Sequence, residues 1–306
     1  ANPFAHESTT GPEIWAQTEH MLDAVVTGVG SGGTLTGLSR YFARVAPHVE
    51  MVLADPKGSI LKDVVDTGKP QKEPGSWLVE GIGEDFIPDN CDLSRVKIAY
   101  EIPDSESFSV ARELLAKEGL LGGSSTGTLV AAALRYCREQ KSPKRVVTFV
   151  CDSGNKYLSK MYNDFWMFDQ GLLPRPQQGN LIDLIVRRYS EGSAVTVRPA
   201  DSLMQAYRRM KLFDVSQLPV MDGDKLVGIL DESDLVLHAQ LDPKKFSDAV
   251  STAMVKDLET VAPNAPISAL LPIFANDRVA IVAEAGKFIG VITKIDLLNY
   301  LRKQLT

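Results

Sequence analysis

The chain has 306 residues, a length that predicts two domains rather than one. Hydrophobic residues make up 44% and charged residues 24% of it, as in a globular protein, and no apolar run reaches membrane-spanning length. The net charge of -6 argues against nucleic-acid binding as the main function. The three cysteines show no metal-ligand spacing, so we expect reduced thiols, no metal site and a cytoplasmic protein.

Strand and helix patterns alternate through the first half of the chain. Apolar runs predict strands at 24–26, 51–54, 96–100 and 146–150, the last of them a central strand. Helical spacing predicts helices at 35–42, 105–118 and 128–138. This alternation predicts an α/β fold with a parallel sheet, whose ligands bind outside the carboxyl ends of the strands.

A glycine-rich turn, Thr27 to Thr34, joins the first strand to the first helix. Such a turn presents backbone N–H groups at the positive end of a helix dipole and predicts a site for phosphate or another compact anion. A turn that needs its glycines for geometry alone explains the pattern equally well. Gly28, Gly30 and Gly33 also satisfy G-x-G-x-x-G, and Asp55 stands where a ribose-binding acid would, so a dinucleotide site is a rival interpretation.

A second glycine-rich turn, Gly122 to Gly127, precedes the helix at 128–138. Its serine and threonine residues are typical of helix N-caps, which is the simpler interpretation of this turn alone. The two turns together favour a small phosphorylated heteroaromatic ligand, because a dinucleotide does not need the second turn.

The chain repeats itself after a proline-, glycine- and glutamine-rich stretch near residues 171–179, which predicts a linker. Gly228 to Leu235 is matched by Gly290 to Leu297, and each copy is predicted to run strand, helix, strand, strand, helix. This order resembles a tandem CBS pair, or Bateman module. We predict a linker at 174–181 and this regulatory module at 182–306.

Six sequence motifs along the first half of the chain, two of which contain the glycine-rich turns, have to be considered together. They are N-P-F-A-H at 2–6 with T-T-G-P-E-I-W at 9–15, G-V-G-S-G-G-T at 28–34, D-P-K-G-S-I-L at 55–61, E-G-I-G-E-D-F-I-P at 80–88, E-G-L-L-G-G-S-S-T-G at 118–127 and D-S-G at 152–154. Together they resemble the fold-type II pyridoxal-phosphate enzymes, the cysteine synthase and cystathionine β-synthase group. The resemblance implies that residues 1–173 are the C-terminal part of a tryptophan synthase β-like catalytic domain. It displaces the dinucleotide interpretation, because Asp55 belongs to one of the motifs.

The resemblance implies pyridoxal 5'-phosphate as the cofactor. It places the ring nitrogen against Ser125, with Ser124 as the neighbouring alternative, and it places the phosphate on Gly30, Ser31, Gly32, Gly33 and Thr34. A neutral hydroxyl leaves the ring nitrogen largely unprotonated, which suits elimination at the substrate β-carbon followed by addition of a thiol. Glu84 stands where the family often has an aromatic residue, so we predict no substrate contact for it.

The family forms its Schiff base through a lysine in a segment of the type S-x-K-D-R. That segment, and the asparagine loop that grips the substrate carboxylate, are not among these residues. We therefore assign no catalytic residue to this chain, expect the N-terminal part of the catalytic domain to be missing, and expect that the chain does not catalyse the reaction alone.

The resemblance to a Bateman module implies an adenosyl ligand in a cleft between the two copies. Thr293 and Asp296 match its ribose-binding pattern, whereas Asp231 and Asp234 match only in part, because Asp231 replaces the hydroxyl and would repel a polyphosphate. S-adenosylmethionine is therefore favoured over ATP. A purely structural pair that mediates dimer contacts is the alternative.

A catalytic domain joined to a Bateman pair favours the branch that condenses L-serine with L-homocysteine to cystathionine. A cysteine synthase using O-acetylserine and sulfide, fused to the same module, is the alternative enzyme. A third interpretation is a protein that is not an enzyme and only senses an adenosyl ligand. We expect small-molecule amino-acid substrates and a homodimer, with neither a nucleic-acid nor a membrane partner.

Overall fold

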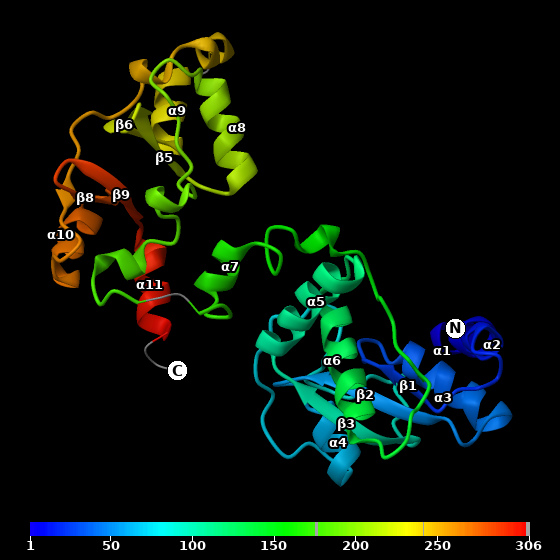
Figure 1. The fold of residues 1–306 in the computed structure, drawn as a ribbon. Coiled ribbons are helices and arrows are strands. Elements are labelled where there is room, and N and C mark those ends of the chain that lie inside the picture. The colour runs from blue at the N-terminus through cyan, green and yellow to red at the C-terminus, as the bar shows by residue number, and fades with distance from the viewer. Residues whose placement is uncertain (175–176, 241, 304–306) are drawn as a thin grey trace. The chain divides into compact units, whose positions relative to one another are not determined.

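The computed structural model describes residues 1–174, 177–240 and 242–303, and it divides the chain into two units, Ala1–Met167 and Phe168–Thr306 (Figure 1). The first unit ends six residues before the boundary predicted at 173. Residues 175 and 176 of the predicted linker lie outside the described residues.

A parallel sheet forms the centre of the first unit, in the strand order β3-β2-β1-β4 (Figure 1). Its strands are β1 (Ala24–Thr27), β2 (Glu50–Pro56), β3 (Val96–Ile102) and β4 (Val146–Val147), and every neighbouring pair is parallel. The predicted α/β fold with a parallel sheet is therefore confirmed.

The prediction that residues 146–150 form a central strand is wrong. Only Val146 and Val147 are in strand conformation, and β4 lies at the edge of the sheet that the described residues form. Both valines are half-buried, and Val150 is 52% exposed. An apolar run indicates a strand, but the number of its neighbours depends on segments far away in the sequence.

Helices connect and flank these strands. They are α1 (Asn2–Ala5), the π-helix η1 (His6–Thr10), α2 (Gly11–Gln17), α3 (Gly33–Val45), α4 (Leu61–Thr67), α5 (Asp104–Glu118), α6 (Ser124–Glu139), the short 3-10 helix η2 (Gly154–Tyr157) and α7 (Asp164–Asp169), which runs into the second unit. The fully buried Leu35, Leu38 and Phe42 form the apolar stripe of α3 that packs into the core. Helix α6 begins at Ser124, because Gly123 is extended at its N-cap, so most of the predicted second turn is the first turn of a helix.

The second unit holds the two predicted copies. The first contains η3 (Leu181–Leu184), η4 (Tyr189–Glu191), α8 (Leu203–Phe213), β5 (Gln217–Asp222), β6 (Lys225–Asp231) and α9 (Glu232–Ala239), followed by η5 (Pro243–Ser247) and η6 (Val250–Thr252). The second contains β7 (Thr260–Val261), η7 (Ile267–Ala269), α10 (Leu270–Ala275), β8 (Ala280–Glu284), β9 (Lys287–Ile292) and α11 (Lys294–Lys303). The order of elements agrees with the prediction, except that the first strand of the first copy is reduced to a single bridge between Val197 and Val220.

The register of the strands shows how closely the copies correspond. The β5–β6 pair shifts register after Val220, and the β8–β9 pair shifts after Val282, which stands 62 positions later. Gly228 and Gly290 are separated by the same number of positions. Within the described residues, none of the helices has both the length and the apolar character needed to cross a bilayer.

Candidate functional site

The first glycine-rich turn lies between the buried end of β1 and the start of α3; we call residues 28–34 the anion cradle. Gly32 has a φ of 80°, and a Cβ on it would lie 2.6 Å from the Cα of Cys91. The first-turn amides of Gly33 and Thr34 have no acceptor four residues earlier within the helix. The loop therefore directs N–H groups to a point at the positive end of α3.

A second loop, residues 80–84, packs against the anion cradle. The Gly83 amide donates to the Val29 carbonyl oxygen at 2.8 Å. A Cβ on Gly30 would lie 2.6 Å from the Gly81 carbonyl oxygen, so only glycine allows this approach. The cradle glycines thus allow the two loops to pack closely against each other.

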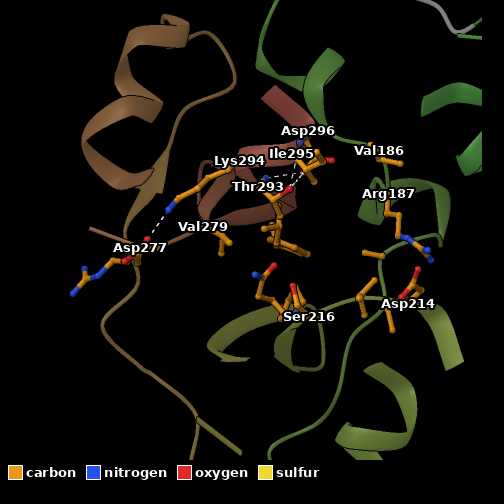
Figure 2. A pocket seen from close by; sticks show the side chains of 18 residues that line it. Val186, Arg187, Asp214, Ser216, Asp277, Val279, Thr293, Lys294, Ile295 and Asp296 are labelled. Atoms are coloured by element: carbon orange, nitrogen blue, oxygen red, sulfur yellow. Dashed lines mark hydrogen bonds and ion pairs between the residues drawn. The ribbon is translucent and has the colours of Figure 1, made fainter. Parts of the chain in front are cut away.

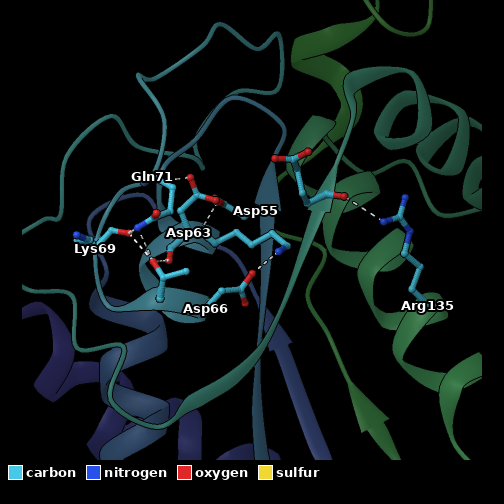
Figure 3. A network of polar contacts seen from close by, with 9 residues as sticks. Asp55, Asp63, Asp66, Lys69, Gln71 and Arg135 are labelled. Atoms are coloured by element: carbon cyan, nitrogen blue, oxygen red, sulfur yellow. Dashed lines mark hydrogen bonds and ion pairs between the residues drawn. The ribbon is translucent and has the colours of Figure 1, made fainter.

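The 55–61 motif supports the 80–84 loop. The Ser59 hydroxyl donates to the Glu84 carbonyl oxygen at 3.1 Å and accepts from the Glu84 amide at 3.0 Å. Asp55 is 1% exposed and accepts a hydrogen bond from the Lys62 amide at 2.8 Å, at the start of α4 (Figure 3). Burial raises the pKa of Asp55 to about 6. A carboxyl group enclosed in this way does not reach a ribose, which removes the acid on which the dinucleotide interpretation relied.

The two serines at the start of α6 are both buried. The Ser124 hydroxyl accepts from the Glu80 amide at 3.0 Å, so it holds the same loop that packs on the anion cradle. The Ser125 side chain is 5% exposed. Because Glu80 and Gly81 are consecutive, the two glycine-rich turns meet at one loop.

Two residues of the N-terminal helical segment also contact the anion cradle. The Asn2 side-chain amide donates to the Ser31 hydroxyl at 3.0 Å, and His6 Nε2 lies 3.2 Å from Thr34 Oγ1. Neither residue is among the site residues predicted from the sequence, although both belong to the 2–6 motif that carries the family resemblance. Their spacing of four positions, which places both on one helix face, is the signal that could have indicated a site role.

The second unit contains a cavity of about 480 Å³ lined by residues of both copies (Figure 2). Thr293 and Asp296 line it, as the predicted adenosyl site requires, whereas Asp231 and Asp234 are not among its lining residues. The repulsion of a polyphosphate that we expected from Asp231 therefore does not act in this cavity. Its side chain instead caps α9 by accepting from the Asp234 amide at 2.8 Å.

Thr293 and Asp296 also form a reciprocal cap at the start of α11. The Thr293 amide donates to Asp296 Oδ2 at 2.7 Å, and the Asp296 amide donates to Thr293 Oγ1 at 3.4 Å. Helix capping alone would explain why a threonine and an aspartate stand at these two positions. That both residues also line a cavity is what supports a binding site. The charged lining residues are of both signs: Lys294 is paired with Asp277, and Arg187, Arg278 and Asp214 also line the cavity (Figure 2).

Comparison with known families agrees with this division of the chain. Residues 1–152 match the family described as "Pyridoxal-phosphate dependent enzyme", and residues 186–240 and 250–303 each match the CBS domain. The cystathionine beta-synthase of Dictyostelium discoideum is 31% identical over 316 residues, covering 99% of this chain and 63% of its own length. That of Saccharomyces cerevisiae is 30% identical over 347 residues, covering 98% of this chain and 68% of its own length. The chain belongs to the cystathionine β-synthase family.

The match to this family runs through both units. The cysteine synthase A of Escherichia coli is 41% identical over 162 residues, but that match covers 52% of this chain and 50% of the relative. The chain spans between 57% and 68% of the length of the cystathionine β-synthases that it matches.

Membership of the cystathionine β-synthase family implies a pyridoxal phosphate cofactor, and the first unit has groups that fit one. The anion cradle has first-turn amides and the hydroxyls of Ser31 and Thr34 for a phosphate, and its glycines let neighbouring segments pack closely against it. The nearby Ser125 offers a neutral hydroxyl to a ring nitrogen. Ser124 keeps its hydroxyl proton when it accepts from the Glu80 amide, so it remains the neighbouring alternative.

Proposed function

We propose that the full-length protein catalyses a pyridoxal-phosphate-dependent β-replacement, in which the thiol of L-homocysteine replaces the hydroxyl of L-serine to give L-cystathionine and water. One observation carries this proposal: the cystathionine β-synthases match 98% to 100% of the chain, with the catalytic and CBS parts together. We further propose that the protein acts as a cytoplasmic homodimer and that its CBS pair binds S-adenosylmethionine.

The residues of the first unit would position the cofactor and limit its movement. The anion cradle would bind the phosphate through the amides of Gly33 and Thr34, and the hydroxyl of Ser125 would orient the ring. The 80–84 loop, held by Ser59 and Ser124, would cover one side of the site and exclude water from it. The bound cofactor would supply the electron-withdrawing ring that allows a hydroxyl group to leave from the substrate β-carbon.

The reaction is tested by assaying the full-length protein with two substrate pairs. We expect cystathionine from L-serine and L-homocysteine at a higher kcat/KM than cysteine from O-acetylserine and sulfide. The opposite order would make the protein a cysteine synthase with a CBS pair. That second candidate is favoured by the 41% identity to cysteine synthase A, which exceeds the identity to any cystathionine β-synthase compared here. Absence of turnover with both pairs, together with adenosyl-ligand binding, would support a sensor instead.

The regulatory ligand is tested by calorimetric titration with S-adenosylmethionine and a matched pair of variants. Asp296→Asn changes a capping carboxylate that lines the cavity, and Asp234→Asn changes the equivalent capping carboxylate outside it. We expect Asp296→Asn to weaken binding at least tenfold and Asp234→Asn to leave it within twofold. Equal losses in the two variants would mean that the ligand does not bind in this cavity.

A further inference from the structure

The polar contacts of His6 form a short chain that ends in the anion cradle. His6 Nδ1 lies 3.0 Å from the hydroxyl oxygen of Thr10, and His6 Nε2 lies 3.2 Å from the hydroxyl oxygen of Thr34. All three side chains are half-buried. The imidazole therefore bridges two hydroxyl groups, one in its own helical segment and one at the start of α3.

Glycines on α3 allow this contact. A Cβ on Gly37 would overlap the carbonyl oxygen of Pro3 and would lie 2.7 Å from the Cβ of His6, and a Cβ on Gly33 would overlap the side chain of Asn2. Gly33 and Gly37 are four positions apart on α3, as Asn2 and His6 are on the segment packed against it. The two pairs form a close helix–helix contact that directs both polar side chains to the cradle.

The requirements of an anion determine the direction of the hydrogen bonds. A phosphate dianion only accepts hydrogen bonds, so the Thr34 hydroxyl has to donate its proton to bind one. The oxygen of Thr34 can then accept a hydrogen bond from His6 Nε2, provided that this nitrogen carries a proton. In the neutral ring, Nδ1 is then an acceptor and receives the Thr10 hydroxyl proton. With the opposite tautomer, Thr34 would donate to His6 and have no proton for the anion.

We propose that His6 is a positioning residue of the anion cradle. It donates from Nε2 to Thr34 Oγ1 and accepts from Thr10 at Nδ1, so that the Thr34 hydroxyl proton points to the bound phosphate. This inference rests on the cradle being the phosphate site of the proposed function. It adds a role for a residue that does not itself touch the ligand.

The test measures binding of inorganic phosphate and of pyridoxal 5'-phosphate by equilibrium dialysis. His6→Phe keeps a planar ring and removes both hydrogen bonds, and Thr34→Val removes the hydroxyl with little change in shape. We expect each variant to raise the Kd of both probes about three- to tenfold. The double variant should bind no more weakly than Thr34→Val alone, because His6 acts through Thr34.

A conservative variant and a control separate this role from a structural one. His6→Gln retains an amide donor for Thr34 and should recover part of the affinity, whereas His48→Phe, at an exposed histidine, should bind as the wild type does. With Trp77 and Trp166 replaced by phenylalanine, fluorescence of Trp15, whose ring centroid lies 6.1 Å from that of Phe42 on α3, reports whether the N-terminal segment keeps its packing. Additive losses with unchanged fluorescence would overturn the proposal.

A spectroscopic measurement tests the same idea without any change in affinity. The protein has four histidines, so selective ¹⁵N-histidine labelling gives few ring signals, and those of His6 are identified by their loss in His6→Gln. We expect the phosphate-bound wild type to show His6 protonated at Nε2; a ring protonated only at Nδ1 would overturn the proposal. If the wild type bound neither probe, the cradle assignment itself would fail. Normal phosphate binding with an unaffected His6→Phe would remove only the role of His6.

Discussion

At the residue scale, the hydrogen bonds of single polar side chains explain why the 55–61 motif contains a serine and an aspartate. Ser59 hydrogen-bonds to both backbone groups of Glu84, and Asp55 accepts from the Lys62 amide. Asp55 Oδ1 is buried, and no hydrogen-bond partner for it is found in the described residues. Ser59 thus stabilises the loop against which the anion cradle packs, and Asp55 stabilises the start of α4.

The raised pKa of Asp55 predicts a stability difference that depends on pH. Its folded value of about 6 lies above the ordinary 3.8, so the native state holds this proton more tightly than the unfolded state. The stabilisation is present below pH 4 and is lost as the pH rises through 6. Asp55→Asn does not ionise, so between pH 4 and pH 7 its free energy of unfolding should rise relative to wild type by up to about 3 kcal/mol.

This difference is measured by urea unfolding followed by tryptophan fluorescence, because Trp15, Trp77 and Trp166 all lie in the first unit. Asp89→Asn, at an exposed aspartate of the same unit, serves as the control. A stability difference between Asp55→Asn and wild type that stays constant from pH 4 to pH 7 would contradict the prediction.

Close helix packing determines the geometry of the site at the scale of elements. Helix α6, which carries Ser124 and Ser125, packs on α5 through Gly127, where a Cβ would overlap the carbonyl oxygen of Ser107. The Thr128 hydroxyl donates to the Ser107 hydroxyl at 2.9 Å in the same buried contact. The position of the serines therefore depends on a glycine in the first turn of their own helix.

Gly127→Ala tests that dependence, because the close contact and the ordinary helix propensity predict opposite signs for its effect on the free energy of unfolding. An alanine in a helix is ordinarily up to about 1 kcal/mol more favourable than a glycine. Here we expect a loss of about 1 to 3 kcal/mol in the free energy of unfolding, because the new Cβ would force α5 and α6 apart. Ser109→Ala, at an exposed position on α5, should change the stability by less than about 0.5 kcal/mol in the same assay. A stabilised Gly127→Ala would show that α6 is free to move.

The whole molecule consists of two units with separate cores. The first core contains residues of β1, β2 and α3, and the cores of the second unit contain residues of the two CBS copies. The predicted boundary at 173 and the observed one after Met167 differ by less than two helical turns, because α7 runs across the boundary. Because each unit has a core of its own, we expect each to unfold as a separate unit.

Separate cores predict unfolding transitions that do not coincide. Urea unfolding followed by tryptophan fluorescence should report the first unit alone, whereas far-ultraviolet circular dichroism reports helices of both units. We expect the two curves to have different midpoints, or the dichroism curve to contain a second step. Coincident curves with equal midpoints and slopes would instead indicate one cooperative unit.

The α/β class, the repeated CBS pair and the family could be predicted from the sequence, because they depend on local periodicity and on motifs of adjacent residues. Three features emerge only from the folded chain: the edge position of β4, the hydrogen bond from the Glu80 amide to Ser124, and the absence of Asp231 from the lining residues of the described cavity. The tertiary structure also brought Asn2 and His6 to the anion cradle through Gly33 and Gly37. These features depend on contacts between segments that are distant in the chain, and no local pattern encodes which segments meet.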